Sequence, residues 1–216
     1  MRIRYSLLLF VLLLAVSTVS AQQIMDESQK TAFLQRLKTS SASVTTISSR
    51  FEEVRHVAVL QSDVESSGHF YCVVPDKMAL RYDKPAGDLL CINGDDLVMI
   101  TQGNRMQTNA RQNPSAKALQ RLLMACLRSD IAAMGFGRKP GQIQVTDYPN
   151  TYEVTLTWGA GSSNPYQSIV LTYKKTDLSL QVLRMNEKNG NFATYKFYDT
   201  KMGQPIGASV FDTSEH

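Results

Sequence analysis

The segment SGHFYCVVPDKMALRYDKPAGDLLCINGDDLVMIT, residues 67–101, decides the fold of this 216-residue chain. It consists of short apolar runs separated by turn-forming residues, namely Pro-Asp-Lys, Lys-Pro-Ala-Gly and Asn-Gly. Asn-Gly between two apolar runs favours a hairpin, because a type I′ turn needs positive φ at both central positions. The segment therefore predicts antiparallel strands over 68–74, 78–83, 88–92 and 97–101.

Alternate residues of the first two predicted strands are apolar or aromatic. They are Phe70, Cys72, Val74, Met78, Leu80 and Tyr82. Side chains alternate between the two faces of a strand, so these six are expected to share one face. The result is a broad apolar surface, and we expect the rest of the chain to extend or cover it.

An amphipathic helix is predicted after a further strand at 105–110. Asn113 is a suitable N-cap, and Pro114 suits the first helical position, where no backbone N–H is needed. One side of this helix carries an apolar stripe, Leu119, Leu122, Leu123, Cys126 and Leu127, and the other side carries Lys117, Arg121 and Arg128. Together with a second short helical turn through Met134, it predicts a helical insert over about 113–136.

The remaining pattern indicates one mainly antiparallel β domain over residues 22–216. Strands are predicted at 47–60, 142–147, 151–158, 168–174, 178–186 and 192–198, and another helix at 25–38. Many short strands suggest a sandwich or barrel. Helices that do not alternate with strands place the chain in the α+β class.

The first 21 residues are predicted to be a signal peptide. Arg2 and Arg4 precede an apolar core at 7–16, and Val19-Ser20-Ala21 form a small-residue cleavage site. The apolar run is shorter than the roughly 20 residues that a membrane span needs. We expect cleavage after about Ala21 and a periplasmic location, with no lipid-anchor cysteine because the mature chain would begin at Gln22.

The charge balance argues against nucleic acid as a partner. Without Arg2 and Arg4, 21 Lys and Arg residues stand against 19 Asp and Glu, which is close to neutral. The three cysteines are Cys72, Cys91 and Cys126. One disulfide between Cys72 and Cys91 is possible in an oxidising compartment, and the sequence leaves this open.

No pattern in the sequence predicts catalysis. The three histidines have no metal-ligand spacing, and no Gly-x-Ser-x-Gly motif occurs. Cys126 lies within an apolar stripe and is interpreted as a small buried hydrophobe rather than a reactive thiol. We therefore expect no enzyme, no metal and no cofactor.

Several motifs together resemble the LolA-like outer-membrane lipoprotein carriers. The similarity covers nearly all of the mature chain and rests on Phe51-Glu52-Glu53, Gly68-His69-Phe70, Val74-Pro75, Tyr82, Pro85 and Asn93-Gly94. The helical insert at 113–136 lies where that family has its lid. In two places the chain departs from the pattern: Val74 replaces an arginine that bonds to the lid, and Glu53 replaces a glutamine.

The resemblance implies an incomplete, half-open β-barrel of about eleven strands with a helical lid. It implies a soluble periplasmic chaperone that binds acyl chains of lipoproteins, or another lipid, and carries them to the outer membrane. An inner-membrane release complex and an outer-membrane receptor would be its partners. We expect a monomer.

The residues expected to bind lipid come from the sheet and the helical insert. They are Phe70, Val74, Met78, Leu80, Tyr82, Leu97, Met99, Leu119, Leu122, Leu123, Leu127, Ile131 and Met134. Periodicity alone favours an ordinary packed core for them. The alternative to a carrier is therefore a non-catalytic structural or adhesion β-domain of the cell envelope.

Overall fold

The structure, a computed structural model, describes residues 22–131, 141–159, 161–162 and 165–214. Its strands are β1 (Gln23–Ile24), β2 (Thr46–Val57), β3 (Ser62–Val73), β4 (Lys77–Lys84), β5 (Leu89–Asn93), β6 (Asp96–Thr101), β7 (Asn104–Asn109), β8 (Gln142–Asp147), β9 (Thr151–Thr157), β10 (Tyr166–Lys174), β11 (Leu180–Glu187) and β12 (Phe192–Met202). Its helices are α1 (Glu27–Ala42), α2 (Pro114–Leu127) and the 3-10 helix η2 (Ala208–Phe211).

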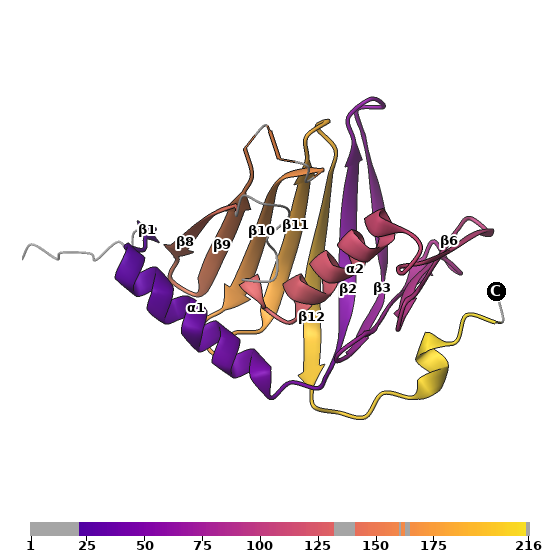
Figure 1. Ribbon diagram of the computed structural model, residues 1–216, viewed down its shortest axis with the longest axis horizontal. Coiled ribbons are helices and arrows are strands. Elements are labelled where there is room, and N and C mark those ends of the chain that lie inside the picture. Colours follow the sequence, from indigo (N-terminus) through magenta and orange to yellow (C-terminus); the bar gives the residue numbers. More distant parts are fainter. Residues whose placement is uncertain (1–21, 132–140, 160, 163–164, 215–216) are drawn as a thin grey trace, which may run out of the picture.

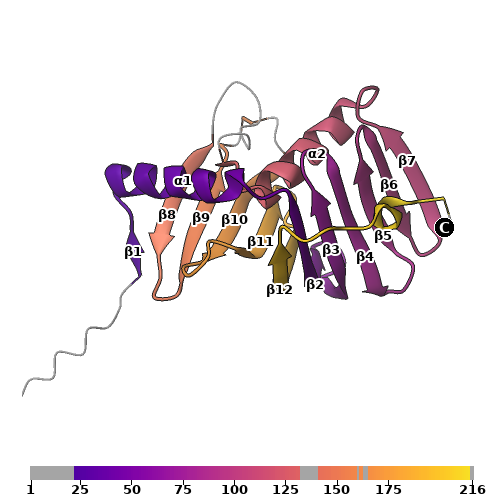
Figure 2. The ribbon, with the colours of Figure 1, turned by 90° about the horizontal axis from the view of Figure 1, so that it is seen from below.

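All twelve strands belong to one antiparallel sheet that is not closed. The strand order is β1-β8-β9-β10-β11-β12-β2-β3-β4-β5-β6-β7. The last strand of the sequence, β12, therefore pairs with β2 in the middle of the sheet. The sheet is curved, and α1 and α2 lie on the same, concave face of it (Figures 1 and 2). The expected antiparallel β class is confirmed, with twelve strands instead of about eleven, and one of these, β1, has only two residues.

β3 is longer than the sequence indicated, and β2 ends at Val57 instead of the predicted residue 60. β3 begins at Ser62 rather than residue 68, because Ser62 pairs with Val57 and the ladder continues without a break to Thr46 and Val73. The segment from Ser62 to Ser67 is mostly polar and exposed, so hydrophobic alternation does not reveal it. Cross-strand pairing decides the conformation here instead of local preference.

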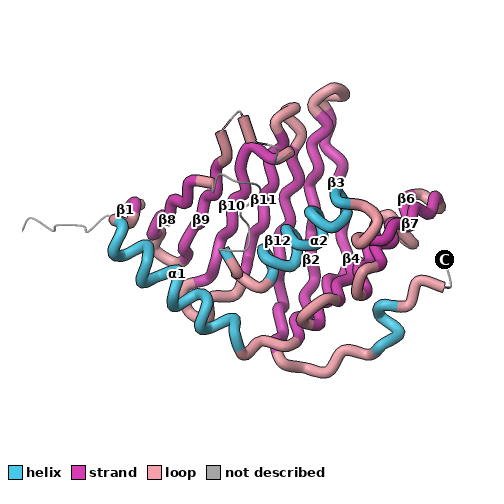
Figure 3. Tube along the Cα trace, viewed as in Figure 1, coloured by secondary structure: helices cyan, strands magenta, loops and turns pink. Residues whose placement is uncertain are grey.

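The main core lies on the concave face, between the sheet and the two helices. Phe70, Cys72, Met78 and Leu80 pack into it together, as the alternation in the sequence predicts. α1 adds Phe33 and Leu37, and α2 adds residues 122–126. Figure 3 shows both helices crossing the strands on this side. Among the described residues, no helix is long and apolar enough to cross a membrane.

A second, smaller core lies on the convex face under the C-terminal tail. It contains Ala79, Leu89, Cys91, Val98, Ile100 and Phe211. Arg81 holds the tail, because its Nε donates to the carbonyl of Val210 at 2.8 Å and its Nη2 donates to that of Asp212 at 2.7 Å. The tail runs across β4 and β5 in Figure 2. It therefore covers apolar surface that β3–β6 would otherwise expose.

The two cysteines that the sequence left as a possible pair lie on opposite faces. Cys72 belongs to the concave core and Cys91 to the convex core, and β4 lies between their strands. Cys72, Cys91 and Cys126 are all free and buried. The possible Cys72–Cys91 bond is therefore wrong, since side chains on opposite faces of a sheet do not meet.

Candidate functional site

Helix α2 is attached to the sheet at its beginning and along its first half. Asn113 caps it, since its Oδ1 accepts from the Ala116 N–H at 3.1 Å, which confirms the predicted cap. Gln120 Nε2 donates to the carbonyl of Gly94 at 2.6 Å, in the turn between β5 and β6. The Gln120–Gly94 bond, with the buried side chains of Leu122 and Leu123, holds the apolar face of α2 against the concave face.

A large cavity, about 560 Å³, lies on the concave face along the central strands and beside Leu123 of α2. Its wall is mostly apolar and includes Phe70, Met78, Leu80, Leu90, Met99, Leu123, Leu183, Met185, Ala193 and Phe197. These residues come from seven different elements, β3, β4, β5, β6, β11, β12 and α2. A volume of this size and lining suits a flexible apolar ligand.

The residues predicted to bind lipid fall into four groups. Phe70, Met78, Leu80, Tyr82, Met99 and Leu123 line the large cavity. Leu97, Leu122 and Ile131 are buried in the adjoining concave core, while Val74 lines a separate, smaller cavity. The side chains of Leu119 and Leu127, and all of Met134, fall outside the described part of the structure.

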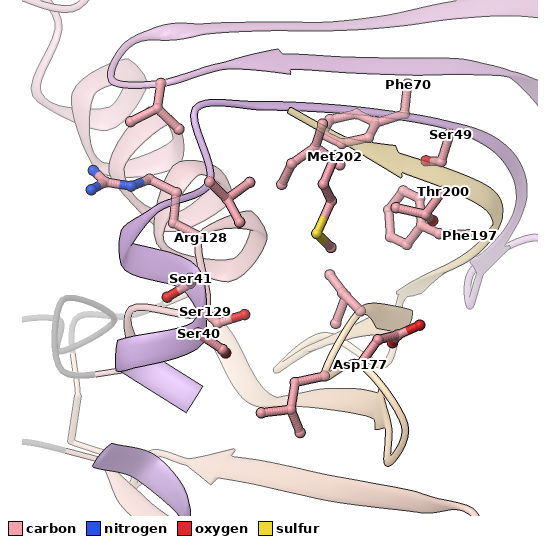
Figure 4. A pocket seen from close by; sticks show the side chains of 15 residues that line it. Ser40, Ser41, Ser49, Phe70, Arg128, Ser129, Asp177, Phe197, Thr200 and Met202 are labelled. Carbon is pink, nitrogen blue, oxygen red and sulfur yellow. The ribbon is translucent and has the colours of Figure 1, made fainter. Parts of the chain in front are cut away.

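The smaller cavity, about 50 Å³, lies between the C-terminal end of α1, the Arg128–Ser129 segment after α2, and residues of β2, β3 and β12. Figure 4 shows Arg128 and Ser129 on one side of it, and Phe70, Phe197 and Met202 on the other. Val74, which stands where the resemblance expects an arginine, contributes an apolar surface here. Arg128 also lines this cavity, so a cationic side chain does reach it, but from the helix side.

A buried carboxylate interrupts the apolar wall of the large cavity. The side chain of Glu53 is only 1% exposed. Its Oε1 accepts from Arg55 Nη2 at 2.7 Å and from the Tyr195 hydroxyl at 3.0 Å, and its Oε2 accepts from the Tyr82 hydroxyl at 2.8 Å. We call these four residues the polar cluster. All of them line the cavity.

The polar cluster assembles because three strands bring their inward-facing side chains together. Glu53 and Tyr195 are directly paired across β2 and β12. Tyr82 comes from β4 and packs edge-on against Phe51, with ring centroids 5.1 Å apart. β4 approaches β3 closely at this level, because a Cβ on Gly68 would lie 2.0 Å from the carbonyl oxygen of Arg81. Gly68 therefore permits the strand approach that positions Tyr82.

Burial and neighbouring charges set the protonation states of Arg55, Tyr82 and Tyr195. Burial raises the pKa of the Tyr82 and Tyr195 hydroxyls, and the nearby Glu53 carboxylate raises both further. Burial acts to lower the pKa of Arg55, but the attraction and hydrogen bond of Glu53, together with Tyr195 and Tyr82, outweigh it and the pKa rises. At neutral pH Arg55 is thus a cation, and Tyr82 and Tyr195 are neutral phenols.

Sequence reasoning noted Glu53 only as a departure from a motif and did not select Arg55 or Tyr195. One local signal was available. Phe51, Glu53 and Arg55 alternate along one strand, so the buried position of Phe51 implies that the two charged residues share its face. Tyr195 had no such local signal, because its place beside Glu53 depends on the pairing of β2 with β12.

The face of α2 that points away from the sheet is basic. Lys117, Arg121 and Arg128 are exposed, as the helical spacing predicted. They line a shallow groove beside Pro75 that also contains Asp95 and other residues of the helix. Across the described ranges of the chain, no group of three or more His, Cys, Asp or Glu side chains is placed to hold a metal ion.

The fold and the cavity together define a class of protein: a single open antiparallel sheet that curves around an apolar cavity and carries helices on its concave side. The chain belongs to the LolA family. The family model described as "Outer membrane lipoprotein carrier protein LolA" matches residues 42–214, which confirms the resemblance inferred from the motifs.

Several solved structures of distant sequence are similar to this chain, and one of them reaches a TM-score above 0.5. An uncharacterised conserved protein from Thermus thermophilus is 8% identical, with a TM-score of 0.51 over 87% of this chain and 96% of that one. A DUF1329 family protein from Desulfovibrio piger is 10% identical, with a TM-score of 0.47 over 88% and 99% of the two chains. A LolA superfamily protein from Nitrosomonas europaea is 11% identical, with a TM-score of 0.41 over 84% and 96%. A search of curated proteins finds no match to this chain.

Proposed function

We propose that this protein is a periplasmic carrier that binds the acyl chains of lipoproteins, or of another lipid, in the large cavity and moves them from the inner to the outer membrane. The observation that carries the proposal is the cavity of about 560 Å³ between the apolar faces of the sheet and α2. A permanently packed core would leave few voids larger than a water molecule. Membership of the LolA family supports the same function.

The hydrophobic effect supplies the binding energy. Each methylene group moved from water into an apolar site contributes about 0.8 kcal/mol, so a 16-carbon chain contributes up to about 12 kcal/mol. A carrier must also release its cargo. Movement of α2 into the cavity when the cargo leaves would offset part of that energy, because it buries the same apolar surface without lipid. Leu123 is the described α2 residue that lines the cavity and would make this contact.

The carrier would take up and hand over its lipid cargo at α2. The basic residues Lys117 and Arg121 of α2, and Arg128 directly after it, are exposed and could contact anionic headgroups or an acidic partner protein. An inner-membrane release complex and an outer-membrane receptor are the partners that this function requires. The exported protein would act as a monomer with no covalent chemistry and no cofactor.

The test is native mass spectrometry of the exported protein, which we expect to carry lipid or lipoprotein. Leu80→Glu and Leu123→Glu each place a charge in the cavity wall and should abolish that load. Leu60→Glu is the matched control, because Leu60 is 70% exposed and lies outside the cavity. Circular dichroism verifies that the variants are folded.

Equal loading of the wild type and both cavity variants would contradict the proposal. So would a natively purified wild type that carries no lipid and takes up none from vesicles. That second result would favour the structural or adhesion domain that the sequence left open.

A further inference from the structure

The polar cluster is not explained by stability alone. Only Glu53 of this ion pair is buried, but taking its carboxylate out of water costs free energy, and well-packed apolar residues of similar volume are often as stable or more stable in such a place. Here Glu53 and Arg55 lie among Leu80, Phe70 and Met185 in the wall of a cavity. An apolar wall would hold hydrocarbon better, so the cluster must serve something in the cavity that is not hydrocarbon.

Arg55 has hydrogen-bonding capacity that the protein does not use. Its side chain is 54% exposed and lines the cavity. Its Nη2 donates to Glu53 at 2.7 Å, and its side chain also hydrogen-bonds with Tyr195. A guanidinium has five N–H donors, so several remain for a ligand. The Tyr82 and Tyr195 hydroxyls donate to Glu53 and orient the carboxylate that in turn holds Arg55 in place.

The charges around the cavity select the kind of ligand. Three carboxylates line it, Glu53, Asp88 and Glu187, against the single guanidinium of Arg55 among its described lining residues. A phosphate or free carboxylate would meet net negative charge there, which disfavours it. A neutral acceptor oxygen would meet no such penalty. The carbonyl oxygen of an ester or amide is such an acceptor, and it is the first polar atom that an acyl chain brings into an apolar site.

A buried carbonyl needs a donor. Without a hydrogen bond, its desolvation opposes binding of the whole acyl chain. We propose that the polar cluster is an anchor for the ester or amide carbonyl of a neutral acyl lipid, with Arg55 as the donor and Glu53, Tyr82 and Tyr195 as positioning residues. This inference rests on the proposed carrier function and names the chemical group that the cavity recognises.

The test compares lipids that differ only at the carbonyl. Dipalmitoylglycerol carries two ester carbonyls, and dihexadecylglycerol carries ether oxygens with chains of the same length. Both are neutral. Each is titrated against the delipidated mature protein loaded with diphenylhexatriene, a pure hydrocarbon probe whose fluorescence reports occupancy of the cavity. We expect the wild type to bind the ester about tenfold more tightly than the ether, which corresponds to about 1.4 kcal/mol.

Arg55→Met keeps the apolar stem and removes the donors. It should reduce ester affinity about tenfold, to the level of the ether, with ether and diphenylhexatriene binding unchanged. Arg50→Met is the matched control, because Arg50 lies on the same strand but on the opposite face, over the ring of Tyr198. It should retain the ester preference.

The outcomes separate the anchor from the carrier. Equal binding of ester and ether by the wild type, with normal diphenylhexatriene binding, overturns the anchor and leaves the carrier function. An equal loss of ester and ether binding in Arg55→Met shows a purely structural role and also overturns it. Tighter binding of dipalmitoyl phosphatidic acid than of dipalmitoylglycerol overturns the neutral-lipid assignment. Failure to bind any of these probes overturns the carrier function itself.

Discussion

Phe70 on β3 and Phe197 on β12 face each other with ring centroids 5.5 Å apart, and both rings line the large cavity and the small one. The pair therefore forms the partition between the two spaces. Phe70 is almost completely buried, and Phe197 nearly so. An acyl chain held in the large cavity, as proposed, would meet this partition.

Phe197→Leu should shorten the partition and join the two cavities. We expect the variant to favour longer acyl chains than the wild type does, because the end of a chain can then pass into the smaller space. A series of saturated fatty acid methyl esters, titrated by probe displacement, measures the preferred length. Phe192→Leu is the control. Phe192 lies on β12 like Phe197, but it stacks on His56 of β2 and does not line either cavity. An unchanged optimum in Phe197→Leu would contradict the partition.

Glu53→Ala should destabilise the protein by about 2–4 kcal/mol. The substitution leaves the hydroxyls of Tyr82 and Tyr195 without their acceptor, and each buried unpaired polar group costs about 1–3 kcal/mol. Arg55 is half exposed and can bind water, which limits the loss. Urea unfolding measures the change. The control is Glu52→Ala, at the exposed neighbouring position, whose free energy of unfolding should stay within about 0.5 kcal/mol of the wild type. Similar losses of stability in the two variants would show that the polar cluster adds no stability.

Gly68→Ala should disrupt the approach of β4 to β3. Its Cβ would lie 2.0 Å from the Arg81 carbonyl oxygen and 2.8 Å from the Tyr82 Cα, so backbone must move. Overpacking of this kind costs about 1–3 kcal/mol or more. We expect a lower melting temperature and weaker lipid binding, since Tyr82 is displaced. Gly159→Ala has open space around its Cβ and should leave both quantities unchanged. Normal stability of Gly68→Ala would show that the strands separate at little cost.

The thiols should be unreactive in the native protein. Burial raises the pKa of Cys72 to about 12, against a smaller lowering by Arg128, and burial raises that of Cys126 to about 12. Reaction with a disulfide reagent at pH 8 should therefore be slow until the chain unfolds, when all three thiols should react without a reductant. Because the unfolded thiols ionise near pH 9, the free energy of unfolding should fall as the pH rises from about 9 to 12. Fast labelling of the folded protein would contradict this.

Reversing the charge of the basic residues on and after α2 tests their proposed contact with anionic membranes. The triple variant Lys117→Glu, Arg121→Glu, Arg128→Glu should load lipid in solution but lose transfer between anionic vesicles. The control reverses three exposed lysines elsewhere, Lys38, Lys196 and Lys201. Transfer measured over a salt series should weaken for the wild type as salt rises, because surface attraction is screened. If the α2 variant transfers as fast as the control, the basic face is an ordinary solvated surface.

Local patterns were sufficient for most of the elements and for one face of the sheet. Alternation at Phe70, Cys72 and Leu80 predicts their common face, and Asn113-Pro114 predicts the start of α2, because both signals depend only on neighbours along the chain. The apolar surface of the site follows from the strand repeat of about 2 residues, and the basic side of the helix from the helical repeat of about 3.6 residues.

Only the tertiary structure determined the polar cluster and the free space. Glu53 and Tyr195 are 142 residues apart, and they meet because β12 returns to pair with β2. Likewise, Cys72 and Cys91 are separated by the sheet itself, and the β3–β4 approach at Gly68 depends on a register shift. Such contacts arise from the pairing of strands distant in the chain. Whether apolar faces pack together or enclose a cavity depends on the curvature of the whole sheet, which no local pattern specifies.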